Sequence, residues 1–434
     1  MFAKLPGPDM STHYDLICGI NPQKGTIGVK GEVHIPVLQT RFLFVLNRGL
    51  KWKSVSQHVG SQVHPVSLYT TDEVEVPRFY NGDLWVVETT VEQENKEEQV
   101  VIDFEYSGQI HPPRKDSGLP QMGYIKNNFV ELACYSAWYP VPFSMETYMS
   151  YQVSLESPFD WTWNANGIHT GTETSDKISV WTWKQDRKVN DLALVGMPLY
   201  NAFIDSESHF WGTKDMVGSQ RVFDEDIHKL RELLEVWLGP RGTEAPLRFV
   251  ITPRQKGGAY ARAGMVVVGG GYPTELSVRN RVLQAMCHEV CHDWFCKASP
   301  LTYDNWIDEA LAEFCSIYIV DDYVNDGFLI SKVNKTLELL EKAGELPSIR
   351  NLVREKDESY AAFYYRGFLL LNKIAESVGI SEFRDVIGDF AKICTQSESV
   401  TSEIFLNVIQ ERLGKKIRSR MESWLDFSGK GVPE

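Results

Sequence analysis

The pattern of hydrophobic and polar positions changes character near the middle of the chain. Up to about residue 200, short β-branched and aromatic runs, many alternating apolar and polar positions, are separated by Gly, Asn, Pro and Asp. Examples are KGTIGVKGEVHI, TRFLFVLNRGLKWKSVS, DLWVVETTVEQ, EQVVIDFEYSG, MSYQVSLESP and KISVWTWKQ. A period of two is typical of half-buried strands. The pattern therefore predicts an antiparallel β domain over residues 1–205.

A helical period follows the strand-rich region. DEDIHKLRELLEVWLGP has apolar residues three and four positions apart and stops at Gly239-Pro240. One strand pair, LRFVITP and GMVVVGG, comes next. Further helices are predicted at about residues 277–296, 306–320, 328–343, 358–378, 381–395 and 402–412. We therefore expect an α+β protein of two domains, with a mostly α-helical domain at residues 206–434.

Composition and charge narrow the range of partners. The 434 residues are 43% hydrophobic and 24% charged, which is an ordinary globular composition. The net charge of −14 argues against nucleic acid or an anionic membrane as the main partner. The N-terminal MFAKLPGPDMSTHYDL lacks the apolar segment of a secretory signal, and seven cysteines are few for this length. These features predict a cytoplasmic protein.

The segment MCHEVCHDWFCKASP contains two of the ten histidines. His288 and His292 are four residues apart in a predicted helix, so both rings lie on one helix face and can reach one zinc ion. Glu289 lies between them without competing for the same ligand position. This is the HExxH arrangement. A catalytic zinc site needs a third protein ligand and an open fourth position, so a second helix must contribute.

The segment DNWIDEALAEF is the candidate for that second helix. Asp304 or Asn305 can cap it, and Glu309 then falls in its first turns. We predict one Zn²⁺ ion held by His288, His292 and Glu309, although the same ligands also accept cobalt or manganese. Glu313 follows one turn after Glu309 and is expected to accept a hydrogen bond from a ligand histidine, which would fix the tautomer of that ring.

Two other readings of these segments remain open. The histidines could belong to a polar helix face without a metal, and Cys287, Cys291 and Cys296 could form a thiolate zinc site. No second cysteine pair has finger-like spacing, so we expect these cysteines to act as small buried apolar residues. The glycine run from Gly269 to Gly271 lacks the Lys-Ser/Thr of a phosphate-binding loop and predicts a turn after a strand.

These motifs resemble the zinc aminopeptidase family of aminopeptidase N and leukotriene-converting hydrolase, the gluzincin peptidases of family M1. HEVCHDWF is similar to the HExxHxWF of that family, and WIDEALAEF to its WLNEG helix, which carries the third zinc ligand. The spacing is two residues shorter here, and Ala310 replaces the usual glycine. HYDLICGINPQKGTIGVKGEVHI and MESWLDFSGKGVPE are similar to the two ends of the family's first two domains. The resemblance implies a saddle-like N-terminal β domain and a thermolysin-like catalytic domain.

The resemblance also implies catalytic roles. Glu289 corresponds to the general base, which accepts a proton and then passes it to the leaving amine. FYYRGFLLL is similar to the Tyr-x-Lys-Gly helix of the family, so Tyr364 corresponds to the tyrosine that stabilises the transition state, with Arg366 in place of lysine. NFVELACYSAWYP is similar to the segment that binds the N-terminal ammonium of the substrate, and there the matching residue is Glu131.

One segment departs from the family pattern. GAYARAGMV is the best match to the Gly-Ala-Met-Glu-Asn segment, so the resemblance assigns substrate binding to Gly258, Ala259 and Arg262. Ala261 stands where the family has a second amine-binding glutamate. Arg262, if it faced the site, would repel an ammonium group.

The leading hypothesis is a zinc metallopeptidase, specifically an aminopeptidase that releases N-terminal residues from peptides. Because Ala261 replaces a glutamate, an alternative is a zinc peptidase of altered specificity that cuts internally or accepts blocked N-termini. A further alternative is a non-catalytic interaction protein on a peptidase scaffold. The expected partners are peptide substrates. The family's C-terminal helical domain has no counterpart in the sequence, which leaves open the alternative that an oligomer or a partner chain takes its place.

Overall fold

The computed structural model describes residues 12–35, 41–71, 73, 83–90, 100–111, 123–143, 148–204, 210–216, 223–254, 258–270 and 278–433. The chain forms two compact units. Unit 1 comprises Met1–Ile204 with two later pieces, Trp211–Lys214 and Thr252–Gly258, and unit 2 comprises Asp205–Phe210, Asp215–Ile251 and Ala259–Glu434. The predicted boundary at residue 205 does not include the two later pieces of unit 1. The hydrophobic period along the sequence indicates local secondary structure, but it does not indicate which unit's core a segment joins.

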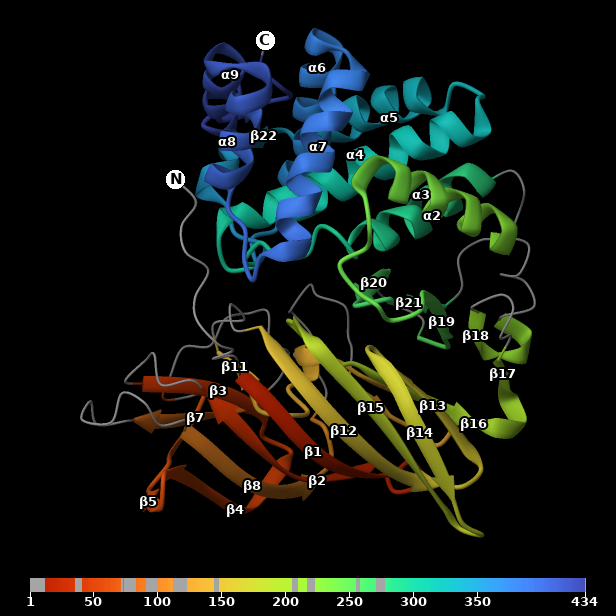
Figure 1. Ribbon diagram of the computed structural model, residues 1–434, viewed down its shortest axis with the longest axis vertical. Helices are drawn as coiled ribbons and strands as arrows, with labels where there is room; N and C mark the ends of the chain where they lie inside the picture. The colour runs from red at the N-terminus through yellow and green to blue at the C-terminus, as the bar shows by residue number, and fades with distance from the viewer. Residues whose placement is uncertain are drawn as a thin grey trace. The chain divides into compact units, whose positions relative to one another are not determined.

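Unit 1 is built on an eight-stranded sheet in the order β14-β15-β12-β1-β2-β8-β4-β5 (Figure 1). Burial alternates along β1 and β12, as the period-two pattern predicts. All neighbouring strands are antiparallel except β1 and β12, which pair in parallel and are more than 120 residues apart in sequence. The strands are β1 (Thr12–Asn21), β2 (Thr26–Ile35), β4 (Leu50–Val59), β5 (Gln62–His64), β8 (Val100–Gly108), β12 (Met149–Pro158), β14 (Ile168–Thr174) and β15 (Ile178–Val189).

Two four-stranded sheets complete most of unit 1. One has the order β13-β16-β10-β9 and the other β11-β3-β7-β6, while β17 pairs with β18 antiparallel at one end of a five-stranded sheet in the order β17-β18-β19-β21-β20. Every residue of β10, which carries Glu131, is buried. The bounds are β3 (Arg41–Asn47), β6 (Ser67–Thr70), β7 (Leu84–Thr90), β9 (Tyr124–Ile125), β10 (Val130–Leu132), β11 (Val141–Pro142), β13 (Trp161–Ala165), β16 (Leu194–Pro198), β17 (Ala202–Ile204) and β18 (Phe210–Thr213).

The core of unit 1 is rich in aromatic residues, and two of its buried tyrosines form hydrogen bonds to the backbone. Tyr14 and Tyr106 are fully buried, and their hydroxyls donate to the backbone carbonyls of Pro140 (2.7 Å) and Trp138 (3.0 Å). These bonds tie the segment that follows β10 to the large sheet. Buried hydroxyls need such partners, because an unpaired one costs about 1–3 kcal/mol.

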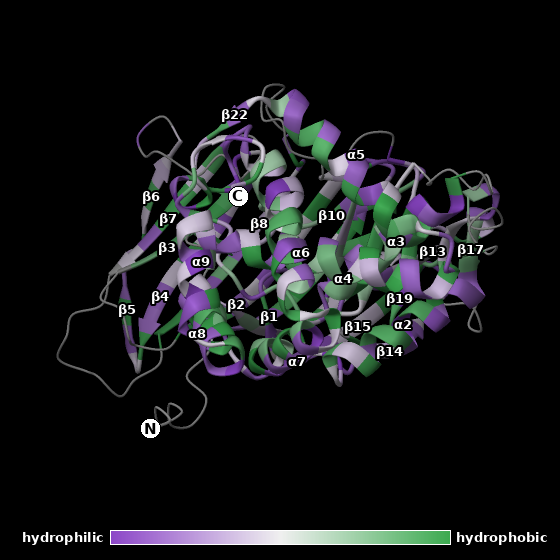
Figure 2. Cartoon of the chain, turned by 90° about the horizontal axis from the view of Figure 1, so that it is seen from above, coloured by the Kyte–Doolittle hydropathy of each residue, from purple (hydrophilic) through white to green (hydrophobic). Residues whose placement is uncertain are grey.

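Unit 2 is mostly helical, and its helices carry hydrophobic and hydrophilic residues along the same element (Figure 2). The central helix α4 is buried over most of its length and packs against α3 and α6. The helices are α2 (Asp224–Leu238), α3 (Arg279–Cys291), α4 (Trp306–Val324), α5 (Phe328–Ala343), α6 (Gly367–Val378), α7 (Ile380–Gln396), α8 (Ser402–Leu413) and α9 (Lys415–Leu425). The strands are β19 (Arg248–Thr252), β20 (Ala259–Arg262), β21 (Met265–Gly269), β22 (Glu345–Leu346) and β23 (Gly429–Lys430).

The predicted fold class, an antiparallel β-rich region followed by a helical domain, is confirmed. Helix α3 ends at Cys291, earlier than the predicted residue 296. The predicted helix at 358–378 contains a π-helical turn, Ala361–Arg366, before α6. Helix α9 was not predicted. None of the helices in the described ranges combines the length and the apolar composition that a membrane crossing requires.

The close approach of α4 and α6 depends on a glycine. A Cβ atom added at Gly367 would lie 2.8 Å from the Cβ of Ala310, so the two helices could not keep their spacing with a larger residue at 367. This contact also shows where Ala310 lies, the residue that replaces the family's usual glycine. It faces α6, on a side of α4 that is fully buried.

Candidate metal centre

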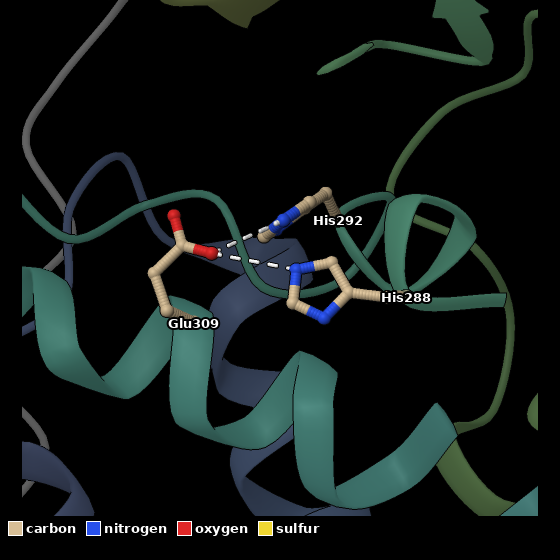
Figure 3. A group of neighbouring side chains, drawn as sticks. All are labelled: His288, His292 and Glu309. Atoms are coloured by element: carbon tan, nitrogen blue, oxygen red, sulfur yellow. Dashed lines mark ion pairs between the residues drawn. The ribbon is translucent and has the colours of Figure 1, made fainter. Parts of the chain in front are cut away.

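Helices α3 and α4 bring together the three residues that the motifs select. Figure 3 shows the ring nitrogens of His288 and His292 directed at one carboxylate oxygen of Glu309. His288 Nε2 lies 3.4 Å from Glu309 Oε2, and His292 Nε2 lies 3.6 Å from the same oxygen. The three ligand atoms all lie within 4.8 Å of one another. In the part of the chain that the structure describes, no cysteine belongs to such a group.

The donor set fits a zinc ion. Two ligands that are each about 2.1 Å from a tetrahedral ion are about 3.4 Å apart, which agrees with the two distances measured to Glu309 Oε2. That oxygen is buried and accepts no hydrogen bond among the described residues. A buried carboxylate oxygen without a partner is costly, and a cation between the three side chains would satisfy it.

Contacts on the far side of each imidazole orient it. His288 Nδ1 lies 3.1 Å from Glu313 Oε2, and His292 Nδ1 lies 2.7 Å from the backbone oxygen of Phe295. Carboxylate and carbonyl oxygens only accept, so Nδ1 is the donor in both rings. Nε2 of each ring is then the atom that would bind a metal, which would take the place of a proton there. The expected contact between Glu313 and a ligand histidine is therefore present.

The groups around His288 are strongly anionic. Burial alone would lower its pKa, but the nearby carboxylates of Glu309 and Glu313 outweigh that effect and raise the pKa of His288 to about 10. Burial would likewise raise the pKa of Glu313, whereas His288, the ammonium of Lys332 and the amide of Gln284 lower it below its usual value. Lys332 lies 3.3 Å from Glu313 Oε1, and Gln284 donates to Oε2 at 2.9 Å. The centre is thus built to hold positive charge.

Arg354 occupies the other oxygen of Glu309. Its Nη1 donates to Glu309 Oε1 and, at 2.9 Å, to Asn305 Oδ1, while its Nη2 donates to the hydroxyl oxygen of Tyr364 at 3.2 Å. Burial favours the neutral form of Glu309, but Arg354, His288 and His292 together hold the pKa of Glu309 well below its usual value. The sequence motifs do not mark Arg354, because it lies 45 residues after Glu309, in a turn without regular periodicity.

Tyr364 lies in the π-helical turn and faces the candidate ligands. Its ring stacks on His288, with ring centroids 5.6 Å apart and planes inclined by 14°. Burial raises the pKa of Tyr364 well above its usual value, so its hydroxyl stays protonated and can donate a hydrogen bond. Arg366 is directed elsewhere, since its guanidinium donates to the carbonyls of Pro347 (2.9 Å) and Gly431 (3.0 Å).

Glu289 lies on α3 between the two histidines and is half-buried. Its negative charge contributes to the raised pKa values of His288 and Tyr364. In unit 2, the structure therefore places the predicted base close to the predicted tyrosine and to the predicted ligands.

Glu131 belongs to unit 1, and its surroundings differ from a solvent-facing strand carboxylate. Both Glu131 and Arg254 are fully buried, and Arg254 Nε donates to Oε1 at 3.0 Å and to Oε2 at 3.3 Å. The hydroxyl of Thr252 donates to Oε2 at 2.9 Å. Glu131 therefore does not face solvent. Its charge is already compensated by an arginine that the sequence motifs do not reveal.

The segment that resembles Gly-Ala-Met-Glu-Asn crosses the boundary between the units. Gly258 belongs to unit 1, where its carbonyl accepts from Arg254 at 2.9 Å. Ala259 and Arg262 lie on β20, an edge strand of unit 2. The guanidinium of Arg262 donates to the Ala261 carbonyl at 2.7 Å and lies 5.1 Å from the ring centre of Tyr260. Substrate binding by these residues stays a prediction.

The remaining predictions concern the cysteines near the histidines and the glycine run. Cys287 and Cys291 are buried free thiols, Cys296 is half-buried, and burial raises the pKa of Cys291 and Cys296. The expectation that the cysteines act as small apolar residues agrees with this. Strand β21 ends at Gly269, and Gly270 has a positive φ of 67°, as a turn requires. Gly271 lies outside the described residues.

Comparison with known proteins agrees with the geometry. Residues 262–424 match the Peptidase family M1 domain, whereas no curated protein matches the chain. An M1 zinc metallopeptidase variant from Deinococcus radiodurans, bound to the substrate Tyr-Ser-Ala, has a similar structure with a TM-score of 0.75 at 17% identity, over 98% of this chain and 95% of that one. A two-domain M1 zinc metallopeptidase variant bound to L-tryptophan gives 0.75 at 18% identity, over 100% and 98%.

Native yeast LTA4 hydrolase is also similar, with a TM-score of 0.73 at 15% identity, over 100% of this chain and 71% of that one. At these identities the structures show the fold alone. The resemblance inferred from the motifs is confirmed for residues 262–424 by the domain match, and the similar structures confirm the fold.

Proposed function

We propose that this chain, which carries a peptidase family M1 domain in residues 262–424, is a zinc-dependent peptidase with its reaction centre in unit 2. The observation that carries the proposal is the convergence of His288 Nε2, His292 Nε2 and the unpartnered Glu309 Oε2 at distances that suit one tetrahedral ion. Glu289 on the same helix supplies the carboxylate that hydrolysis needs and metal storage does not.

Each side chain then has a defined task. When bound, the zinc ion supplies a Lewis acid and an activated water. Glu289 accepts a proton from that water and returns it to the leaving amine. The Tyr364 hydroxyl, held protonated by burial, donates to the substrate oxygen as it becomes negative. Glu313 and the Phe295 carbonyl keep the two imidazoles in the ligating orientation.

For the substrate class we propose short peptides, from which the enzyme releases the N-terminal residue. The support comes from the similar structures, which are described as bound to Tyr-Ser-Ala and to L-tryptophan. The centre is proposed to use one zinc ion. The hypothesis of a scaffold without catalysis is the weaker one. Among the described residues, no side-chain hydrogen bond or ion pair gives Glu289 a structural role.

A second specificity is favoured by a separate observation. The Glu131 carboxylate is paired with buried Arg254, and Ala261 replaces the other amine-binding glutamate, so neither position offers an unpaired negative charge to a substrate ammonium. We therefore propose, as the alternative, a zinc peptidase that tolerates blocked N-termini or cuts internally.

One experiment separates these possibilities. The purified protein is analysed for bound metal and then incubated with paired peptides that differ only in N-terminal acetylation. Cleavage of the free peptide alone supports the aminopeptidase, and equal cleavage of both supports the altered specificity. One equivalent of zinc without any cleavage would refute the peptidase proposal and leave the scaffold hypothesis.

A further inference from the structure

We propose that Arg354 is a positioning residue that holds the third metal ligand in a one-oxygen binding mode and at the same time orients the Tyr364 hydroxyl. The inference rests on the proposed function of the centre and goes beyond it, because Arg354 lies outside both metal-binding motifs. It follows from three hydrogen bonds of a single guanidinium.

The first part concerns Glu309, whose two oxygens have different partners. Oε1 accepts from Arg354 Nη1, whereas Oε2 faces the two histidine nitrogens at 3.4 Å and 3.6 Å. Because Arg354 occupies Oε1, only Oε2 is available to a metal. Nη1 also donates to Asn305, which is buried at the start of α4, so the guanidinium is tied to the helix end that carries Glu309.

The second part concerns Tyr364. Its hydroxyl oxygen accepts from Arg354 Nη2 at 3.2 Å. A phenol oxygen that accepts a bond from a cation directs its own hydrogen away from that cation and becomes a stronger donor. The hydrogen of Tyr364 is thereby directed away from Arg354. A hydrogen bond to Glu309 contributes to the raised pKa of Tyr364, and a substrate oxygen would replace Glu309 as the acceptor. A guanidinium suits both tasks, since its donors have fixed directions in one plane.

The turn that carries Arg354 is itself anchored. The Ser359 hydroxyl donates to the Arg354 carbonyl at 2.9 Å, and Leu352 and Ile349 are buried on the preceding side. The arginine is therefore held in place by contacts that do not involve the metal ligands. This anchoring is what a residue that sets the position of others requires.

Arg350 provides a matched control. Its side chain has an exposed fraction of 31%, against 29% for Arg354, and it forms an ion pair with Asp426 at 3.0 Å and a hydrogen bond to the Tyr303 hydroxyl at 2.9 Å. It lies in the same unit, and none of its described contacts involves the candidate ligands. Arg350→Met therefore removes an arginine ion pair of similar exposure without touching the proposed function of Arg354.

The first test needs no peptidase activity. Zinc affinity is measured by chelator competition, and the visible spectrum is recorded after cobalt substitution, for the parent protein, Arg354→Met, Arg354→Lys and Arg350→Met. We expect Arg354→Met to weaken zinc binding by about 10–100-fold, because Glu309 loses the partner that orients it. The cobalt bands should shift, because Glu309 can then offer both oxygens. Arg350→Met should match the parent in both measurements. Parent-like affinity and spectrum in Arg354→Met would overturn the inference.

The second test is a kinetic cycle at saturating zinc with Tyr364→Phe. Arg354→Met should lower kcat at least about tenfold with little change in KM, and should have a much smaller effect on kcat when Tyr364 is already Phe. An equal effect in both backgrounds contradicts a role through Tyr364. Arg354→Lys keeps the positive charge but not the planar, two-pronged donor geometry of the guanidinium. It should therefore restore at most one of the two properties, zinc affinity or kcat, to the parent value. Parent values of both in Arg354→Lys would contradict the proposal. A parent protein that binds zinc but cleaves nothing refutes the peptidase proposal, and the metal measurements still decide the role of Arg354.

Discussion

Arg254 and Glu131 form an ion pair in unit 1 in which both side chains are completely excluded from solvent, with Nε 3.0 Å from Oε1. Thr252 supplies a further hydrogen bond to the same carboxylate. Such a pair loses its hydration on both sides, so its cost is offset only while both partners are present. Glu131 therefore contributes to the stability of unit 1, whether or not it also binds a substrate.

Removing one partner of this pair should therefore destabilise the protein strongly. We expect Arg254→Met to lower the free energy of unfolding by about 3–5 kcal/mol, because it leaves an uncompensated buried carboxylate. Urea unfolding followed by tryptophan fluorescence measures the change. The double variant Arg254→Met/Glu131→Leu should recover much of the loss. The exposed pair of Lys53 and Glu105 is the control, and Lys53→Met should leave the unfolding midpoint nearly unchanged. A midpoint for Arg254→Met close to that of the parent would show that the buried pair is not essential.

Glu313→Gln should weaken zinc binding by about 10–100-fold without preventing it. The amide keeps the shape of the carboxylate, but it no longer fixes the His288 tautomer by charge, and it leaves Lys332 without its ion pair. Chelator competition measures the affinity. Glu341→Gln, which changes an exposed carboxylate of the same unit, serves as the control. Unchanged affinity in Glu313→Gln would mean that His288 is oriented by its packing alone.

Tyr364→Phe should lower kcat by about 10²–10³-fold while zinc content stays at one equivalent. The change removes only the hydroxyl that donates to the developing negative charge, and the stacking on His288 is kept. Steady-state kinetics and elemental analysis are measured on the same preparation. Tyr365→Phe, one residue away and also half-buried, should retain parent kinetics. Similar kinetics for both variants would remove Tyr364 from the mechanism.

Glu289→Gln and His288→Ala should separate catalysis from metal binding. The first keeps all three candidate ligands, so the protein should retain zinc and lose turnover. The second removes one of the three ligands, and zinc should be lost during purification or brief dialysis. Metal content and peptide cleavage are measured for both. Full activity of Glu289→Gln would exclude it as the base, and retained stoichiometric zinc in His288→Ala would exclude the proposed ligand set.

The parts of this protein that could be predicted are those with short-range signals. Helix α3 and the start of α4 follow from apolar spacing and turn residues, and the four-residue spacing of His288 and His292 places both on one face. The expected pairing of Glu313 with a ligand histidine follows from one helical turn after Glu309. Even in these regions, α3 ends earlier than predicted, and a π-helical turn at Tyr364 replaces the predicted α-helix. Packing against α4 decides the ends of a helix more than propensity does.

Other features depend on residues far apart in the chain. Burial alternation along β1 and β12 identifies both as strands, but it does not report that they pair in parallel across more than 120 residues. Arg254 reaches Glu131 over 123 positions, and Arg354 reaches Glu309 over 45. Nothing in the local composition marks either arginine, since an arginine in a turn is usually solvated.

The amino-acid order alone therefore specified that a β domain is followed by an α-helical domain. It also specified the helix face that carries the histidines and the identity of the candidate ligands. These features depend on the spacing of residues that are close together in the chain. Folding decided which oxygen of Glu309 faces the histidines, which arginine holds the other, and that Glu131 is neutralised by Arg254. Those outcomes are set by the free energy of burying charged groups, which must find partners wherever the tertiary structure brings them, and no local pattern encodes that choice.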